Sequence, residues 1–394
     1  RMGRKVAIVG AKMTKFGNLI DKTLMDLLVE PSESLIEEFK VERSNITSVY
    51  VSNLLGEISS RQTAVATALA DYIGLKNVAA ERIENGPASG ASALRYAFME
   101  ISSGNSNMVL VAGAEKMRTA PTDVVTDLVS MMSHPEVEYP SGATMPSLGA
   151  LFARLYMQKY DVKPEHLAMV AVKNHSNAMK NPFAQLKKEV TLEQLIGPGS
   201  ESFNPYVAEP LRLYDMSPMT DGGAALLLAD LDTALSYTKK PVILEGIGES
   251  TDALALQDRD DPTDLKAVRL SAEKAYRMSG IKPEEVNVAE VHDAFTVLEI
   301  AISEEVGFFK KGEGKLALQN GVTKIDGEKP INTSGGLKAR GHPLGATGLA
   351  QATEITWQLQ GTADQRQVKD ASTGFTVNMG GFGSNAVSIV YRRY

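Results

Sequence analysis

A glycine-rich stretch, NTSGGLKARGHPLGATG over Asn332–Gly348, holds the side chain best suited to chemistry, His342. Gly335 and Gly336 allow backbone conformations that a Cβ would forbid, and His342 lies between a glycine and a proline that restrict its backbone. Helical periodicity begins directly after Gly345. A titratable group on a tight turn at a helix start is well placed for catalysis. A plain turn with a solvated histidine is the alternative, and a glycine-rich loop alone does not decide between them.

A second histidine, His292, follows the predicted strand Val286–Val291 in the sequence VHDAF. Catalytic groups of α/β proteins gather at the carboxyl ends of strands. Two imidazoles on corresponding turns can polarise a carbonyl group and move a proton, because their pKa lies near neutrality. The alternative is a helix-capping histidine paired with Asp293.

Two further turns contain groups that stabilise negative charge. The turn Asn85–Gly90 (NGPASG) precedes a predicted helix, whose N-terminus favours an anion, although Pro87 also suits a plain first helical position. The terminal turn NMGGFG, which contains Gly380, can offer backbone N–H groups to an oxyanion or simply close a hairpin.

Four polar residues are candidates for binding a substrate. Lys338 and Arg340 flank the His342 turn and could meet a phosphate, although such charges are commonly solvated. Asn174 lies on a predicted helix, where a solvated face or a lid over the substrate are the two interpretations. Ser217 begins the turn before the predicted strand Ala224–Leu228.

The composition excludes several kinds of site. The 394 residues carry a net charge of −7, which argues against nucleic-acid binding as the main function and requires a local basic patch for any anionic substrate. The absence of cysteine removes disulfides, thiolate metal sites and cysteine nucleophiles, and fits a cytoplasmic location. The five histidines lack metal-ligand spacing, so we predict no bound metal. Neither a bilayer-length apolar run nor a signal-peptide pattern occurs, so we predict no membrane insertion.

Hydrophobic patterning predicts an alternation of strands and helices typical of an α/β protein. The predicted strands are Lys5–Gly10, Ser48–Leu55, Met108–Gly113, Ala224–Leu228, Pro241–Gly246, Val286–Val291 and Asn385–Tyr391. The predicted helices are Leu24–Phe39, Gln62–Ile73, Leu148–Lys159, Pro164–Lys180 and Leu265–Met278.

This alternation repeats, so we predict an internal duplication. The first unit covers residues 2–235 and the second covers residues 240–394. A looser segment at about 119–210 is predicted to form an inserted loop domain over the core. Several apolar residues in and near that segment indicate an adaptable surface or plain core: Met132, Met145, Leu148, Met157, Met216 and Met219.

Taken together, the motifs resemble the thiolase superfamily over nearly the whole chain. GGLKARGHPLGATG is the most specific, and ENGPASGASAL, VKNHSNAMKNPFAQ, LRLYDMSPMTDGGAAL, VHDAF and NMGGFG accompany it in the family's order. VHDAF is similar to the form found in archaeal and sterol-carrier-type thiolases.

The resemblance implies a five-layered αβαβα fold of two duplicated mixed-sheet halves, with a loop domain that covers coenzyme A. It also implies a homodimer, and some relatives recruit a small zinc-ribbon/OB-fold partner. His342 would match the family's catalytic histidine, and His292 the group that holds the thioester oxygen. Gly380 would match the backbone donor of the second oxyanion hole.

One departure from the family changes the expected chemistry. Aligned through Ala88, Ser89 and Gly90, the position of the nucleophilic cysteine is occupied by Pro87. Proline has neither a nucleophile nor a backbone N–H group, so the attacking atom and one oxyanion donor are lost together. Ser89 lies two residues along the turn and is expected to point elsewhere.

We therefore predict that the chain acts on an acyl-CoA thioester and forms or cleaves a carbon–carbon bond without a cysteine acyl-enzyme. His342 would serve as acid and base, His292 would polarise the thioester carbonyl, and no cofactor would be covalently bound. Two alternatives stay open. One is a silent subunit that binds acyl-CoA or supplies architecture, and the other is the acetyl-CoA acetyltransferase that a family label would give.

Overall fold

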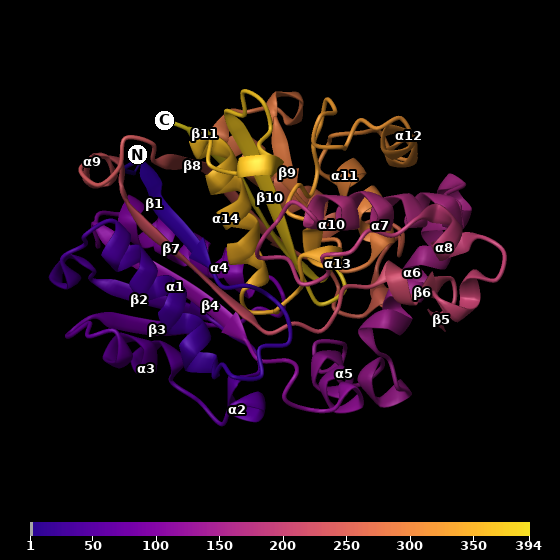
Figure 1. Cartoon of the computed structure of the whole chain (residues 1–394), viewed down its shortest axis with the longest axis horizontal. Coiled ribbons are helices and arrows are strands. Elements are labelled where there is room, and N and C mark those ends of the chain that lie inside the picture. Colours follow the sequence, from indigo (N-terminus) through magenta and orange to yellow (C-terminus); the bar gives the residue numbers. More distant parts are fainter. Residues whose placement is uncertain (1–2) are drawn as a thin grey trace.

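The computed structural model describes residues 3–394, and its central element is a nine-stranded mixed sheet (Figure 1). The strand order is β3-β2-β4-β7-β1-β8-β11-β10-β9. The strands of this sheet are β1 Val6–Met13, β2 Ser48–Ser52, β3 Ala79–Ile83, β4 Met108–Glu115, β7 Gly222–Asp230, β8 Val242–Thr251, β9 Val288–Glu290, β10 Thr373–Gly380 and β11 Asn385–Arg393. A separate two-stranded sheet pairs β5 Tyr206–Ala208 with β6 Leu211–Arg212.

The helices surround and separate the strands. They are α1 Leu24–Glu38, α2 Gly56–Ser59, α3 Val65–Tyr72, α4 Ser89–Ser102, α5 Thr122–Ser130, α6 Met145–Tyr160, α7 Pro164–Ala178, α8 Leu192–Ile196, α9 Leu231–Leu235, α10 Lys266–Ser279, α11 Thr296–Glu305, α12 Gly314–Gln319, α13 Gly336–Ala339 and α14 Thr347–Gln360. Among these residues no helix is long and apolar enough to span a bilayer.

The pairing of the strands repeats within the sheet. In the first half β2 and β4 are parallel, β4 and β7 antiparallel, and β7 and β1 antiparallel. In the second half β9 and β10, β10 and β11, and β11 and β8 follow the same sequence of directions. Only two residue pairs, Ala7 with Ile243 and Ile8 with Val242, join the halves through β1 and β8. Because hydrogen bonding makes the sheet continuous, the division near residues 235–240 stays a prediction.

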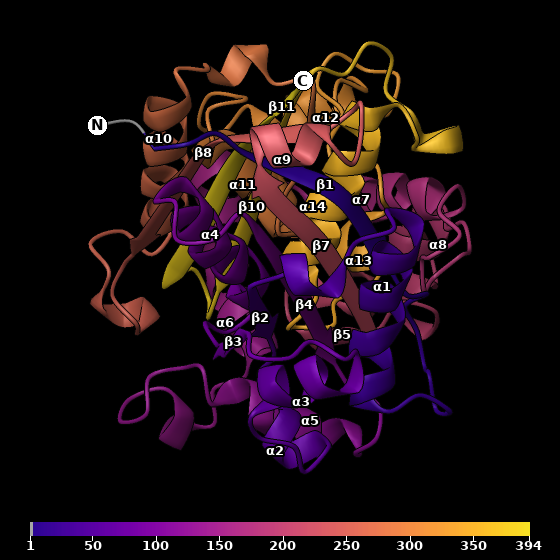
Figure 2. The ribbon, with the colours of Figure 1, turned by 90° about the vertical axis from the view of Figure 1, so that its left-hand side faces the viewer.

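Three apolar clusters show the layers. One lies under α1 and α3 and includes Leu28 and Leu69; the second surrounds α4 and α14 and includes Leu94 and Ile355; the third lies under α10 and α11 and includes Val268. Figure 1 shows α4 and α14 between the indigo and the yellow strands, and Figure 2 shows α14 beside β1 and β7. The layers thus run helix, sheet, helix pair, sheet, helix, which confirms the predicted αβαβα arrangement.

The segment between β4 and β7 folds over the second half of the sheet, on the right of Figure 1. The predicted helices here correspond to α6 and α7, and the chain also forms the unpredicted α5 and α8. Thr144 caps α6 by accepting the N–H of Ser147, whose hydroxyl accepts the N–H of Thr144 in return. Residues of this segment, among them Thr144 and Met145, line one wall of the cavity described next.

Candidate active site

A cavity of about 670 Å³ lies between the insertion and the second half of the sheet. Four of the predicted site residues line it: His292, His342, Pro87 and Ser217. The two imidazole rings stand edge to face, with their centroids 5.1 Å apart. The structure therefore brings together two turns that are about 50 residues apart in the sequence.

His292 is held in one tautomer by the terminal hairpin. It follows β9 and is 2% exposed, and its Nδ1 accepts the backbone N–H of Met379 at 3.2 Å. Asn378 Nδ2 lies 3.3 Å from the same nitrogen. Since Nδ1 accepts, the ring hydrogen is on Nε2. Burial, aided by the charge of Arg340, lowers the pKa of His292 to about 3, so the ring is a neutral hydrogen-bond donor.

His342 has the opposite arrangement. The hydroxyl of Thr347 donates to the carbonyl oxygen of Pro343 at 3.1 Å, which leaves the hydroxyl oxygen as an acceptor for His342 Nδ1–H at 2.6 Å. The lone pair of Nε2 is then free to accept a proton. Burial, with smaller contributions from His292 and Arg340, holds the pKa of His342 well below its usual value. The pair thus combines one donor with one base.

Glycines and carboxylates shape the His342 turn. Gly335, Gly336 and Gly341 have φ values of +103°, +65° and +121°, a region that residues with a Cβ rarely adopt. A Cβ on Gly336 would also lie 2.2 Å from the carboxylate of Asp293, which accepts the N–H of Leu337 at 2.7 Å. Asp293 therefore ties the His292 turn to α13 and does not pair with His292 itself.

A second carboxylate holds the other end of the turn. Glu115, at the end of β4, accepts the N–H of Gly345 at 3.1 Å and those of Leu54 and Leu55 at 2.9 and 3.0 Å. Complete burial raises the pKa of Glu115 to about 7. This carboxylate fastens the start of α14 to the end of β4 and to the loop that follows β2.

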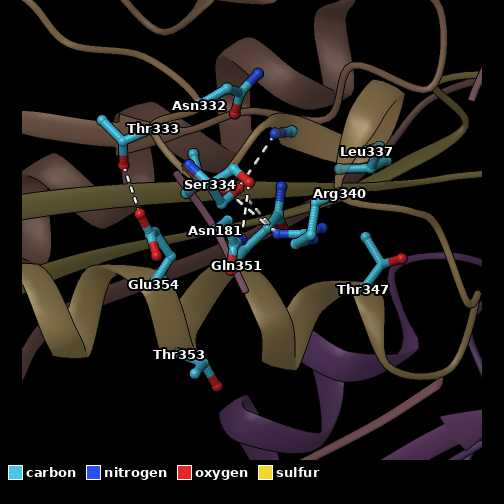
Figure 3. A network of polar contacts seen from close by, with 12 residues as sticks. Asn181, Asn332, Thr333, Ser334, Leu337, Arg340, Thr347, Gln351, Thr353 and Glu354 are labelled. Atoms are coloured by element: carbon cyan, nitrogen blue, oxygen red, sulfur yellow. Dashed lines mark hydrogen bonds and ion pairs between the residues drawn. The ribbon is translucent and has the colours of Figure 1, made fainter. Parts of the chain in front are cut away.

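The predictions for Lys338, Arg340 and Asn174 are wrong, because all three side chains are buried and none lines the cavity. Lys338 Nζ lies 3.0 Å from His175 Nε2, and Arg340 pairs with the buried Glu290 at 3.3 Å. Figure 3 shows Arg340 beside Ser334. Asn174 donates to Asp293 at 2.8 Å. These groups support the turn from behind and cannot reach a phosphate.

The remaining predicted positions have mixed outcomes. Ser89 does point away, since its hydroxyl donates to Gly86 and accepts the N–H of Asn85 at 2.8 Å. Gly380 lines a neighbouring cavity of about 580 Å³, whereas Gly381 lines both. The oxyanion role of Gly380 stays a prediction.

One candidate functional residue, Arg118, was not identified from the sequence. Arg118 is the only charged residue among those lining the cavity, it is exposed, and it has no ion pair within residues 3–394. Asp221 accepts its backbone N–H at 2.9 Å and that of Met117 at 2.8 Å, which fixes the turn and leaves the guanidinium free. Arg118 lies just beyond the carboxyl end of the strand Met108–Glu115, and this position could have identified it as a candidate.

The pH dependence of catalysis tests the environment of His342. A base must be deprotonated to act, so a lowered pKa moves the loss of activity to lower pH. We expect the acid limb of kcat/KM to lie at lower pH than the limb of an ordinary histidine, whose pKa of about 6.5 would place the loss of activity there. A profile of kcat/KM against pH, with circular dichroism as a control for folding, makes the measurement. A limb centred near pH 6.5 would contradict the burial argument.

Comparison with known families covers nearly the whole chain. Residues 6–232 match the family model for the thiolase N-terminal domain, and residues 248–393 match the model for the thiolase C-terminal domain-like region. An acetyl-CoA acetyltransferase from Methanothermobacter thermautotrophicus is 42% identical over 99% of this chain and all of its own. Human sterol carrier protein 2 is 29% identical over 98% of this chain and 72% of its own length.

A solved structure described as an Ltp2-ChsH2(DUF35) aldolase has the same fold. It superposes with a TM-score of 0.85 at 24% identity and covers 98% of this chain and 97% of its own.

Proposed function

The chain belongs to the thiolase family, and from this we propose that it forms or cleaves a carbon–carbon bond beside an acyl-CoA thioester without an acyl-enzyme. The observation that carries the proposal is the pairing of an imidazole that donates a hydrogen with an imidazole that can accept one, their ring centroids 5.1 Å apart, in a cavity that has no thiol. Pro87 lines the same cavity and offers neither a nucleophile nor an N–H group. Enolate chemistry needs only the two groups that are present.

In the cleavage direction the substrate is a β-hydroxyacyl-CoA. Nε2 of His342 removes the proton of the β-hydroxyl group, and the bond between the α and β carbons breaks. The β carbon leaves as an aldehyde or ketone, and the electron pair of the broken bond becomes the enolate of the shortened thioester. Nε2–H of His292 donates to the enolate oxygen, and His342 returns its proton to the α carbon. The reverse sequence forms the bond.

A solved relative supports this class of reaction by analogy. The structural neighbour with the TM-score of 0.85 is described as an aldolase. The analogy concerns the reaction type alone, because its 24% identity establishes the fold and leaves the residues of the site to be argued separately.

The decisive experiment is incubation of the purified protein with a β-hydroxyacyl-CoA. We expect a carbonyl compound and a shortened acyl-CoA in equal amounts, measured by liquid chromatography and mass spectrometry. The intact protein should carry no acyl adduct. Absence of both products, with and without proteins that co-purify from the native host, would contradict the proposal.

Pro87 also favours a second candidate function, that of a subunit that binds acyl-CoA without turning it over. Such a subunit would show saturable binding of acyl-CoA and no products. The relative that is 42% identical is named an acetyl-CoA acetyltransferase, and a stable acetyl adduct on this chain would favour that activity instead.

We further propose a homodimer that works with a small partner subunit. The edge strand β3 has no strand on its outer side within residues 3–394, and exposed apolar side chains lie nearby on Ile58 and Tyr72. The aldolase neighbour is described with a DUF35 component. Light scattering of the purified protein should give twice the mass of the chain.

The cytoplasmic location of the protein stays a prediction.

Arg118 is proposed to meet a phosphate of coenzyme A, because it is the cation at this cavity. Replacing Arg118 by alanine should raise KM for acyl-CoA about tenfold and leave kcat unchanged. For an acyl-pantetheine, which lacks the nucleotide, KM should not change. Steady-state kinetics with both substrates check this, and an equal loss with both would place Arg118 elsewhere in the reaction.

A further inference from the structure

Two side chains that do not line the cavity, those of Gln185 and Thr220, meet beside the backbone of His342. Gln185 ends the motif VKNHSNAMKNPFAQ over residues 172–185, and Thr220 belongs to the motif LRLYDMSPMTDGGAAL over residues 211–226. Neither side chain takes part in the proposed reaction. Resting on the proposed function, we infer that Thr220, supported by Gln185, is a positioning residue that holds His342 in place for proton transfer.

A single hydroxyl group joins the three residues. Thr220 is fully buried, and its Oγ1 accepts the backbone N–H of His342 at 2.9 Å. The hydroxyl hydrogen is directed to Oε1 of Gln185 at 2.6 Å, and the carbonyl oxygen of Pro218 is a more distant acceptor at 3.2 Å. Nε2 of Gln185 donates to the carbonyl oxygen of Met219 at 3.1 Å, which leaves Oε1 as the acceptor of the amide. The Thr220 oxygen therefore presents a lone pair to the N–H of His342.

Thr220 lies on a firmly held part of the fold. It is followed by Asp221, and β7 begins one residue later. The backbone of Asp221 exchanges two hydrogen bonds with Gly17, at 2.9 and 3.1 Å, and its carboxylate accepts two backbone N–H groups of the turn after β4. The contact with the His342 turn is close, because a Cβ on Gly341 would lie 2.9 Å from the methyl carbon of Thr220. Glycine at position 341 thus lets the turn approach its support.

The bond from His342 to Thr220 fixes the middle of the turn, whose ends are held by the two buried carboxylates described above. Within residues 3–394 Thr220 is the one acceptor for the backbone N–H of His342, and the imidazole Nδ1 is bonded to Thr347 at 2.6 Å. Loss of the first bond would leave a buried N–H group unsatisfied and let the turn shift. A displacement of about 1 Å can lower a rate by about 10²-fold.

The kinetic test removes the hydroxyl group and keeps the shape of the side chain. Thr220→Val should lower kcat for carbon–carbon cleavage by about tenfold to 10²-fold, because the base is displaced. KM for acyl-CoA should stay within about twofold of the wild-type value, because Thr220 does not line the cavity. Calorimetry with S-alkyl-CoA thioethers, which keep the coenzyme but contain no bond that can be cleaved, should give the wild-type Kd. Thr220→Ser restores the acceptor and should recover most of kcat.

A matched control separates this role from the general loss of a buried hydroxyl group. Thr356, on α14, is also fully buried, and its hydroxyl donates to the carbonyl oxygen of Ala352 at 2.7 Å. Thr356→Val should keep the wild-type kcat, and circular dichroism checks the folding of every variant. A wild-type kcat in Thr220→Val, or an equal loss in Thr356→Val, would overturn the inference.

A spectroscopic test needs no substrate. The chain has five histidines, so protein labelled only with ¹⁵N-histidine gives few amide signals, and His342→Ala identifies that of residue 342. Thr220→Val should move this amide proton upfield and speed its exchange with deuterium, and Thr220→Ser should not. Should Thr220→Val fail to fold, Gln185→Met replaces it, with a smaller shift because Pro218 can take the hydroxyl hydrogen.

The two tests can fail separately. An amide signal of residue 342 that is unchanged in the folded variant would sink the inference. A shifted signal, in a protein that cleaves no β-hydroxyacyl-CoA even as the wild type, would sink only the proposed function and leave Thr220 as the support of His342.

Discussion

If the proposed function is right, replacing His342 by alanine should lower kcat for carbon–carbon cleavage by about 10²–10⁴-fold, the range expected for loss of a positioned acid and base. His292 is the other imidazole among the described residues that line the cavity, and it cannot replace the base because its Nε2 carries a hydrogen. Binding of S-alkyl-CoA thioethers should change by less than about threefold, because the imidazole touches the reacting atoms and not the coenzyme. Single-turnover kinetics and calorimetry separate the two effects.

A matched variant, in which another histidine is replaced by alanine, controls for a general loss of folding. His166, at the start of α7, is partly exposed, lies outside the cavity and accepts the N–H of Lys163 at 2.9 Å. His166→Ala should keep wild-type kcat. Unchanged cleavage by His342→Ala would remove this histidine from the mechanism and leave the non-catalytic subunit as the better description.

Replacing Pro87 by cysteine should create a covalent acyl-enzyme, which we expect the native chain not to form. The side chain of residue 87 lines the cavity together with both histidines. Residue 87 also precedes the fourteen-residue helix α4, whose N-terminus would stabilise the thiolate of a cysteine. Cysteine also restores a backbone N–H group. After incubation with acetyl-CoA, intact-protein mass spectrometry should show one added acetyl group, which is absent from the native protein.

Two companion variants identify the origin of the adduct. Pro87→Ala should form no adduct, since it restores the N–H group without the thiol. The double variant Pro87→Cys/His342→Ala should acylate more slowly than the single variant, because the base is missing. If the single variant stays unmodified although its thiol reacts with iodoacetamide, residue 87 does not occupy the position of the family's nucleophile.

Elements with a strong local signal could be predicted from the sequence. The helix predicted over Leu24–Phe39 spans Leu24–Glu38, because its apolar stripe and the Thr23 cap lie within one segment. The edge strand β3 and the short helix α12 were missed. AAERI has no alternation of apolar and polar residues, and six residues are too few to show a helical period.

The residues of the site also differ in how far the sequence alone could predict their positions. His292 and His342 could be identified because each lies on a turn whose glycines or strand end are visible in the sequence. The burial of Lys338 and Arg340 could not, because their partners His175 and Glu290 come from elements 163 and 50 residues away. A charged side chain looks solvated until the groups that surround it are known.

The turn at Pro87 has a consequence for how such an enzyme could change its chemistry over time. Asn378 donates to the carbonyl oxygen of residue 87 at 2.7 Å and accepts the N–H of Ala91 at 3.2 Å. These bonds hold main-chain atoms, so they do not depend on which side chain residue 87 carries. Substitution at this one position can therefore add or remove a nucleophile while the fold and the histidine pair persist. Such a site is a point of evolvability, where one codon selects between reaction types.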